Sequence, residues 1–355
     1  MPEPITSERQ ITPRWLTARL RENGHLDRGK VSRINKECFT THFSHICRLE
    51  VAYSDDASRE LPPRMLLKAA LSGSAGSLDM GKVEVSAYVA LAGAMADPPI
   101  VRCFDAVHSA RSNRSHILME DLSPTHFQPE IPVPPSRRHC ELCVQSLAQL
   151  HAFWWQNPGL GATIGELLNE TSLNEIVAQL EAGLAGIIAF LGDRLSPHRR
   201  IIFERALDLM PEFWRRRLTS TRHNTLIHGD AHLWNFLHPK DPDSGRAYLI
   251  DLGTTNRIRP PTNDLAHMMA LQWFPERRAI MELGLLQCYH DALVSFGVKD
   301  YRWEDCVLDY RFSVISHLFT PIFQWAGNWI PAIVWWHNLD RIFQAYEDLH
   351  CGELM

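Results

Sequence analysis

The chain has 355 residues, of which 45% are apolar and 22% are charged, and its formal net charge is −5. This composition supports two ordinary lobes with hydrophobic cores and excludes a mostly disordered chain. Because basic residues are not in excess, we expect no nucleic-acid partner. The longest apolar stretches are interrupted well short of about 20 residues, so we also expect no membrane and no membrane-spanning helix.

The first residues contain no basic segment followed by an apolar one, which argues against a secretory signal. Of the eight cysteines, only Cys140 and Cys143 lie close together in sequence. Apolar residues recur around them at helical spacing, so we interpret the pair as helix packing and not as a zinc or redox site. We therefore expect a cytoplasmic protein with reduced thiols.

The N-terminal third has the pattern of one helix followed by a strand-rich region. Residues 9–24 have amphipathic spacing, with Thr12 as the N-cap and Pro13 in the first turn. Strand-like runs follow within 31–53 and 62–70, such as 46–53 and 64–70, and then around 100–108 and 115–120, with a helical pattern at 79–94 between the second and third regions. Strands that follow one another so closely predict an antiparallel sheet with a helix packed against it.

Beyond residue 123 the pattern becomes mainly helical. A Pro-rich segment at 131–135 precedes Ser136, a suitable N-cap. Long helical patterns cover 137–156, 173–192, 197–218, 276–296, 302–319 and 332–349, and short strand-like runs occur within 225–255. The sequence therefore predicts an α+β protein with an N-lobe at 1–118, a hinge at 119–122 and a C-lobe at 123–355.

Three polar side chains have the spacing of a phosphoryl-transfer site. The segment 228–235 reads HGDAHLWN, which places Asp230 five residues before Asn235, and Asp251 follows after sixteen more. A kinase-type site uses a carboxylate to orient and deprotonate the attacking hydroxyl, then a carboxamide and a second carboxylate to hold Mg²⁺. A lone aspartate in a turn more commonly stabilises the turn. The three spaced groups together favour catalysis.

This arrangement resembles the aminoglycoside phosphotransferase/choline kinase superfamily along nearly the whole chain. The most specific matches are the segments 228–235, 250–251 and 264–266. The segments 12–16, 118–122 and 146–154 look most like the ecdysteroid-kinase-like branch. The resemblance implies a bilobal protein-kinase-like fold with a small antiparallel-sheet N-lobe and a large, mainly helical C-lobe. It also implies that ATP and Mg²⁺ serve to phosphorylate a hydroxyl group of a small molecule.

The resemblance assigns roles to the residues of the C-lobe. Asp230 would be the catalytic base, which accepts the hydrogen bond of the substrate hydroxyl and places its oxygen in line with the γ-phosphate. Asn235 and Asp251 would bind Mg²⁺, a cation that prefers oxygen ligands. Three further residues would brace the catalytic loop: His228, His232 and Asp264.

The N-lobe would supply the nucleotide clamp. Lys68 lies in an apolar strand-like run, where a cation is costly unless it is paired, and it would contact the α- and β-phosphates. Glu84, sixteen residues further on, would form its ion pair, although both could instead face solvent. Backbone groups of the hinge would bind the adenine edge through Met119, Glu120 and Leu122.

The expected phosphate-covering loop, near residues 35–42, departs from the family pattern. No glycine occurs from residue 31 to residue 71, whereas glycine usually permits close approach of the backbone to phosphates. Leu252 also stands where an aromatic residue is commoner, and Asn263 stands where glycine is usual. These departures leave open a pseudokinase that binds a partner or metabolite without turnover. The intact catalytic segment favours an active kinase.

A metal-dependent hydrolase is the alternative from another enzyme class. His228, Asp230 and His232 alternate, so on a strand all three would project to one side and could bind Zn²⁺. His267 would be the nearest further ligand downstream. This hypothesis leaves the other kinase-type residues and the order of the lobes unexplained.

The acceptor is expected to bind the C-lobe, where aromatic residues are frequent. They are Trp273, Phe274, Trp303, Phe323, Trp325, Trp329, Trp335 and Trp336. Most such rings belong to a protein core, but a cluster could also enclose an apolar alcohol or an ammonium group. We therefore expect a moderately apolar hydroxyl compound or an amino alcohol in preference to a polycationic aminoglycoside. The sequence leaves the oligomeric state unknown.

Overall fold

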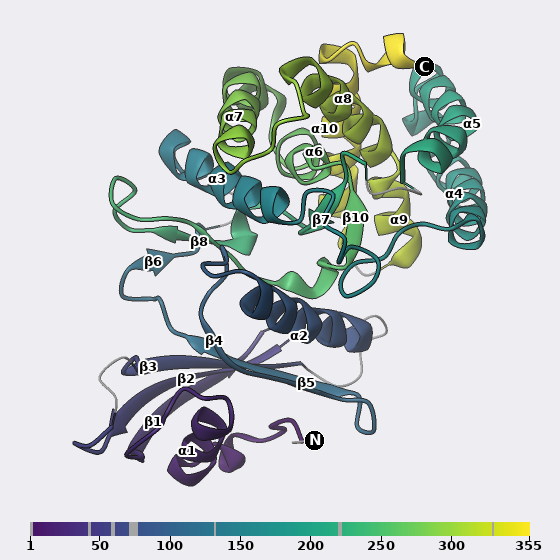
Figure 1. The fold of residues 1–355 in the computed structure, drawn as a ribbon. Helices are drawn as coiled ribbons and strands as arrows, with labels where there is room; N and C mark the ends of the chain where they lie inside the picture. The colour runs from purple at the N-terminus through teal and green to yellow at the C-terminus, as the bar shows by residue number, and fades with distance from the viewer. Residues whose placement is uncertain are drawn as a thin grey trace. The chain divides into compact units, whose positions relative to one another are not determined.

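The computed structural model describes residues 3–41, 44–57, 61–70, 77–130, 133–218, 222–328 and 330–355. The chain forms two compact units (Figure 1). Unit 1 comprises Met1–Glu130 and Phe236–Thr255, and unit 2 comprises Ile131–Asn235 and Asn256–Met355. Unit 1 carries an antiparallel sheet and unit 2 is mainly helical, which confirms the expected α+β class. The lobe bounds expected from the sequence, 1–118, 119–122 and 123–355, stay a prediction.

The main sheet of unit 1 has five antiparallel strands in the order β1-β2-β3-β5-β4. They are β1 (Val31–Thr40), β2 (Ser44–Tyr53), β3 (Arg64–Ala70), β4 (Cys103–Ser109) and β5 (Arg114–Glu120). The strand runs expected between 46 and 120 are therefore present. The segment 35–42, expected to cover the phosphates, lies mostly in β1, and its last residue is outside the described residues.

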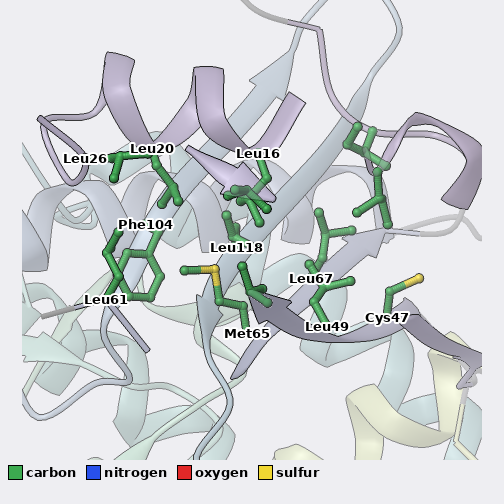
Figure 2. Close-up of a cluster of buried hydrophobic side chains, with 14 of the residues drawn as sticks. Leu16, Leu20, Leu26, Cys47, Leu49, Leu61, Met65, Leu67, Phe104 and Leu118 are labelled. Atoms are coloured by element: carbon green, nitrogen blue, oxygen red, sulfur yellow. The ribbon is translucent and has the colours of Figure 1, made fainter. Parts of the chain in front are cut away.

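Helices cover both faces of this sheet (Figure 1). Helix α1 (Pro13–Glu22) begins at the expected cap, where Thr12 accepts a hydrogen bond from the backbone of Trp15. Its buried Leu16 and Leu20 join Leu67 of β3 in one hydrophobic cluster (Figure 2). Successive strand residues face opposite sides, so Lys68 faces the other side, where α2 (Ser77–Ala94) packs against β4 and β5.

One expectation for the cysteines is wrong. Cys38 of β1 and Cys47 of β2 form a disulfide, whereas we expected only reduced thiols. They are direct cross-strand partners with Cα atoms 4.1 Å apart, which brings the two sulfur atoms within bonding distance. Eight residues separate the two cysteines in sequence, so their pairing becomes visible only when the register of the hairpin is known. Six other cysteines, including the helix-packing pair, are free thiols.

A smaller sheet completes unit 1. It contains β6 (His126–Phe127), β8 (Phe236–Pro239) and β9 (Tyr248–Leu249), in the order β6-β8-β9. Directly after β9, the short helix η4 (Leu252–Thr254) packs against α2. The segment that carries Asp251 therefore folds with the N-terminal sheet, although it is more than one hundred residues away in sequence.

Unit 2 is built around a group of long helices. They are α3 (Arg137–Phe153), α4 (Glu170–Leu191), α5 (Pro197–Leu218), α7 (Pro275–Ser295), α8 (Trp303–His317) and α10 (Ala332–Asp348). All six were expected, and Ser136 caps α3 as predicted. The sequence patterns did not predict α6 (Thr262–Leu265), the π-helical turn η5 (Ala266–Leu271) or α9 (Thr320–Gly327). Strands β7 (Thr225–Ile227) and β10 (Arg257–Arg259) pair antiparallel.

One helical stretch among the described residues, Glu170–Arg194, is long and apolar enough to cross a membrane, judged by length and composition alone. Core helices of folded proteins meet the same test. The α4 part of this stretch packs against α5 and α9, and it buries one side through Leu173, Leu180 and Ile187.

Candidate active site

Lys68 lies between two carboxylates within unit 1. Its Nζ atom is 2.7 Å from Oε1 of Glu84 on α2, so the ion pair expected between these residues is present. Its second partner is Oδ1 of Asp251. Burial opposes the charge of the ammonium group, but the two carboxylates outweigh this effect and raise its pKa. Lys68 is therefore a permanently charged group at neutral pH.

Asp251 combines an open side chain with an unusual backbone. Its φ angle is 59°, in the left-handed region that non-glycine residues rarely adopt. The residue stands between the end of β9 and the start of η4, where the chain reverses against α2. Its carboxylate remains half exposed while one oxygen contacts Lys68. Carboxylate oxygens are hard donors of the kind that Mg²⁺ prefers.

The three residues expected at the hinge lie at and just beyond the end of β5. Met119 is buried and pairs with Leu66 of β3. The backbone N–H of Glu120 donates to the Arg102 carbonyl at 2.9 Å. The carbonyl of Leu122 accepts two backbone bonds of the turn that follows. These backbone groups are thus engaged within unit 1, and their contact with an adenine ring stays a prediction.

In unit 2, a buried carboxylate fixes the loop that carries Asp230. Asp264 accepts hydrogen bonds from the backbone N–H groups of His228 at 2.7 Å and Gly229 at 2.8 Å. It also contacts Nε2 of His151 on α3 at 3.1 Å. Burial raises the pKa of such a carboxyl, but these donors overcome it and lower the pKa of Asp264. Gly229 has φ of 84°, a conformation that suits glycine and turns the chain into Asp230.

The carboxylate of Asp230 is surrounded by three polar side chains. Asn235 donates from Nδ2 to the backbone carbonyl of Asp230 at 2.9 Å and to Oδ2 at 3.1 Å. Nε2 of His232 lies 3.7 Å from Oδ2, and Nε2 of His267 lies 3.5 Å from Oδ1. Burial strongly lowers the pKa of His267, so this imidazole is neutral. His228 accepts from the backbone N–H of Asp230 at 3.3 Å.

These contacts differ from the arrangement required by the hydrolase hypothesis. The predicted triad needed His228, Asp230 and His232 to point together, but the His228 ring is fully buried and bonds the backbone. Among the described residues, the group whose ligand atoms all lie within 4.8 Å of one another is instead Cys38, His45 and Cys47. That group lies in the first hairpin of unit 1, and its two cysteines are joined by the disulfide.

The aromatic residues proposed to enclose the acceptor do not form one cluster. Trp273 is buried, with the Arg277 guanidinium stacked on it, and Phe274 is exposed under Arg341. A second group forms at α4, α9 and α10, where the rings of Phe190, Trp325, Trp335 and Trp336 lie close together. Trp329 is outside the described residues. The apolar character of the acceptor therefore stays a prediction.

Two arginines near Asp230 were missed in the sequence. Arg257 and Arg259 lie on β10, and Arg257 pairs with Ile227, three residues before Asp230. Alternating arginines on a short strand would have indicated a shared face, but the three-residue strand is too short to give a periodic pattern. His151 was also missed as a partner of Asp264, because its helix shows only ordinary amphipathic spacing.

Comparison with known proteins supports the fold and identifies the family. A model of the ecdysteroid kinase-like family matches residues 43–299, well over half of the chain. A proposed aminoglycoside phosphotransferase from Ralstonia eutropha JMP134 superposes with a TM-score of 0.56 at 16% identity, covering 95% of this chain and 97% of its own. The macrolide 2′-phosphotransferase MphH from Brachybacterium faecium gives 0.51 at 14% identity, covering 92% and 97%.

At such identities these structures establish a common fold only, and they confirm the expected kinase-like architecture. No curated protein sequence matches the chain. The match to the family model agrees with the resemblance carried by the catalytic segment, and it covers that segment completely. The chain therefore belongs to the ecdysteroid kinase-like family.

Proposed function

We propose that the protein is an ATP- and Mg²⁺-dependent kinase that phosphorylates a hydroxyl group of a small molecule. The observation that carries this proposal is the position of Lys68 between Glu84 and Asp251. These three residues come from a strand, a helix and a distant turn, and they match the lysine, glutamate and metal-binding aspartate of kinase-type sites. A structural ion pair would need only one of the two carboxylates.

Unit 2 supplies the groups that act on the acceptor. In the proposed reaction, the acceptor hydroxyl attacks the γ-phosphorus of ATP, the bond to the β,γ-bridging oxygen breaks, and ADP leaves. The proton of the hydroxyl passes to the Asp230 carboxylate. Asp264 holds the two backbone N–H groups before Asp230, and Asn235 fixes one carboxylate oxygen. His267 is neutral and therefore adds no positive charge beside the Asp230 carboxylate.

The donor groups fit a magnesium ion. Asp251 offers a half-exposed carboxylate, and Asn235, with Nδ2 bonded to Asp230, offers its amide oxygen. Both are hard oxygen ligands, as Mg²⁺ requires. When bound, the ion would neutralise charge on the transferred phosphoryl group. Lys68 would contribute a second positive charge to the α- and β-phosphates.

The experiment that tests this proposal measures ADP release by the purified chain with Mg-ATP. The acceptor panel contains choline, amino alcohols, sterols, sugars, aminoglycosides and hydroxy acids, and Asp230→Ala is the matched control. Release that depends on one acceptor class and on Mg²⁺, and that disappears in the variant, would support the kinase. Turnover retained by Asp230→Ala would refute the base assignment. An absence of both turnover and a Mg-ATP-induced thermal shift would favour the pseudokinase.

A further inference from the structure

A cavity lies entirely within unit 2, beside the strand that pairs with the catalytic loop. It has a volume of about 480 Å³, within the range typical of small-molecule sites. Its walls come from the segment 166–169, from Ser172 and Ile176 on α4, and from β10 and the residue before it. Arg257 and Arg259 are the cationic groups of this wall.

The register of β10 directs both arginines to one side. Arg257 pairs with Ile227 and Arg259 with Thr225, so the two residues alternate along the strand with Ile258 between them. Ile258 is fully buried and packs over Gly165, where its side chain would lie 2.8 Å from an added Cβ. Because the side chain of Ile258 points into the protein, the side chains of its two neighbours on the strand, Arg257 and Arg259, point to the opposite side, where the cavity lies.

Neither guanidinium has a carboxylate partner among the described residues. No carboxylate oxygen lies within 4.0 Å of either one, and the bond donated by Arg259 goes to the carbonyl of Ile258 at 2.8 Å. Partial desolvation lowers the pKa of Arg257, against the attraction of Asp230, Asp264 and Glu166. Desolvation and the neighbouring charge of Arg257 lower the pKa of Arg259 to about 10. Two cations in mutual repulsion form a site that an anion would stabilise.

The strand that forms one wall of the cavity pairs with the strand that leads to the proposed catalytic base. Arg257 is the cross-strand partner of Ile227, three residues before Asp230, and Asp230 is the carboxylate that acts on it most strongly. The two groups nevertheless form no ion pair at 4.0 Å or less. A molecule whose hydroxyl contacts Asp230 could therefore place a second group against the arginines.

We propose that Arg257 and Arg259 bind an anionic group of the acceptor, a carboxylate or a phosphate, so that the phosphorylated hydroxyl belongs to an acidic molecule. The inference rests on the proposed kinase function and narrows its substrate class. Arginine suits this role because its planar fork binds both oxygens of a carboxylate or phosphate. Asn169 and Ser172 add polar groups at the start of α4, where the helix dipole also favours an anion.

The rest of the cavity wall defines the body of the acceptor. Leu167, Leu168 and Ile176 provide apolar contacts beside the two arginines. An acidic molecule with an apolar body matches the arginines and the apolar residues, with its anionic group placed away from Glu166, the carboxylate among the lining residues. Two guanidinium groups would repel an ammonium group, so this site disfavours the amino alcohols and aminoglycosides that the sequence left under consideration.

The first test measures binding calorimetrically, with the purified full-length chain and without nucleotide. The probes share one body and differ in charge: 3-hydroxyoctanoate, its uncharged methyl ester and the cation 1-amino-3-octanol. Glycerol 3-phosphate and inorganic phosphate represent the phosphate source. We expect at least one anionic probe to bind about tenfold or more tightly than the ester, with no binding of the amine. Equal affinity for the acid and its ester, or no anion binding, would overturn the inference.

Variants then assign the binding to the two arginines. Arg257→Met and Arg259→Met should each weaken anion binding about tenfold or more, whereas Arg216→Met on α5, outside the cavity, should leave it unchanged. Asp230→Asn should retain or tighten it, because a repulsive charge is removed. If a methionine variant fails to fold, Arg259→Lys keeps the charge, loses the fork and should bind more weakly. Unchanged affinity in folded variants, or displacement of the probe by ADP, would overturn the assignment.

The two proposals fail in different ways. Anion binding that depends on the arginines, combined with no phosphate transfer to any acceptor of the panel and no Mg-ATP-induced thermal shift, would reject the kinase and leave the anion site intact. Phosphate transfer to an uncharged alcohol at the same kcat/KM as to its acidic counterpart would retain the kinase and reject the anion site. ADP release with 3-hydroxyoctanoate against its methyl ester makes this comparison directly.

Discussion

Asp105 and Asp251 of unit 1 are both held by a cation, yet their surroundings are opposite. The Asp105 side chain is 2% exposed and receives two hydrogen bonds of 2.7 Å from Arg19, with His116 at 3.0 Å as a further partner. The Asp251 side chain is 53% exposed, and its backbone adopts the left-handed conformation. Unit 2 shows the same contrast, because Asp264 is 0% exposed and Asp230 is 41% exposed.

The contrast separates structural carboxylates from those available for chemistry. Asp105 and Asp264 are fully bonded inside the protein, and their donors lower the pKa of each carboxyl although burial opposes this. Such a group stabilises the fold but has no oxygen left for a ligand or a transferred proton. Asp230 and Asp251 retain solvent access, which the roles proposed for them, base and metal ligand, require. Both kinds of carboxylate thus occur in each unit.

The largest effect is expected for Asp251→Asn. Asparagine tolerates the left-handed backbone and leaves Glu84 as the partner of Lys68, so the free energy of unfolding should change by less than about 1 kcal/mol. Phosphate transfer should fall by about a thousandfold or more, because the anionic metal ligand is lost. Turnover assays across a Mg²⁺ titration, with urea unfolding in parallel, measure both quantities. Near-normal turnover at any Mg²⁺ concentration would remove Asp251 from the metal site.

The buried carboxylate of unit 2, Asp264, should show the opposite result, a large loss of stability on substitution. Asp264→Ala leaves the N–H groups of His228 and Gly229, the first of them buried, and His151 without this acceptor, which should lower the free energy of unfolding by about 3–5 kcal/mol. Asp230→Ala is the matched control and should cost less than about 1 kcal/mol, because its carboxylate is partly exposed. Urea unfolding of both variants decides the matter, and equal losses would abolish the distinction between the two carboxylates.

The chemical groups of the site were easier to predict from sequence than their surroundings. The spacing of Asp230, Asn235 and Asp251 can be counted directly in the sequence. Glu84 follows Lys68 by sixteen residues, and a strand followed by a helix can bring two side chains at this spacing into contact. The partner of Asp264, His151, comes from a helix more than one hundred residues earlier. Such long-range pairs depend on tertiary packing, which leaves no periodic pattern in either segment.

The same limit applies to the elements that were missed. The α6–η5 segment, 262–271, is almost wholly buried, so it lacks the polar face that marks an amphipathic helix. Arg257 and Arg259 lie in a strand of three residues, too short for an alternating pattern. The disulfide between Cys38 and Cys47 follows from the hairpin register, which the sequence alone does not define.

A buried histidine of unit 2 should make stability depend on pH. Burial lowers the pKa of His317 from 6.5 to about 4, with Asp264 opposing this shift and Arg257 supporting it, and the His267 ring lies beside it. Between pH 6.5 and 4 the unfolded chain binds a proton that the folded protein excludes. The free energy of unfolding therefore falls as the pH falls through this window, by at most about 1.4 kcal/mol per pH unit.

Urea unfolding between pH 7.5 and 4.5 measures this slope. His317→Gln retains hydrogen-bonding capacity towards the Asn263 carbonyl and Thr320 but does not titrate, so its slope should be shallower than that of the original chain. His198→Gln, at a side chain that is largely exposed, is the control and should not change the slope. An unchanged slope in His317→Gln would show that other groups cause the acid sensitivity.

The smallest effect is expected for reduction of the disulfide in the first hairpin of the sheet. The disulfide between Cys38 and Cys47 closes a loop with a sequence separation of nine residues, so reduction should lower the free energy of unfolding by about 2–3 kcal/mol. Urea unfolding with and without a thiol reductant measures this difference, and Cys38→Ser should reproduce the reduced value. Cys140→Ser would be a poor control because that thiol is buried, so Cys288→Ser, at a partly exposed free cysteine, serves instead. The reductant could instead lower the stability of Cys38→Ser as strongly as that of the original chain. The effect would then come from outside the hairpin, and the disulfide would contribute nothing measurable to the stability of unit 1.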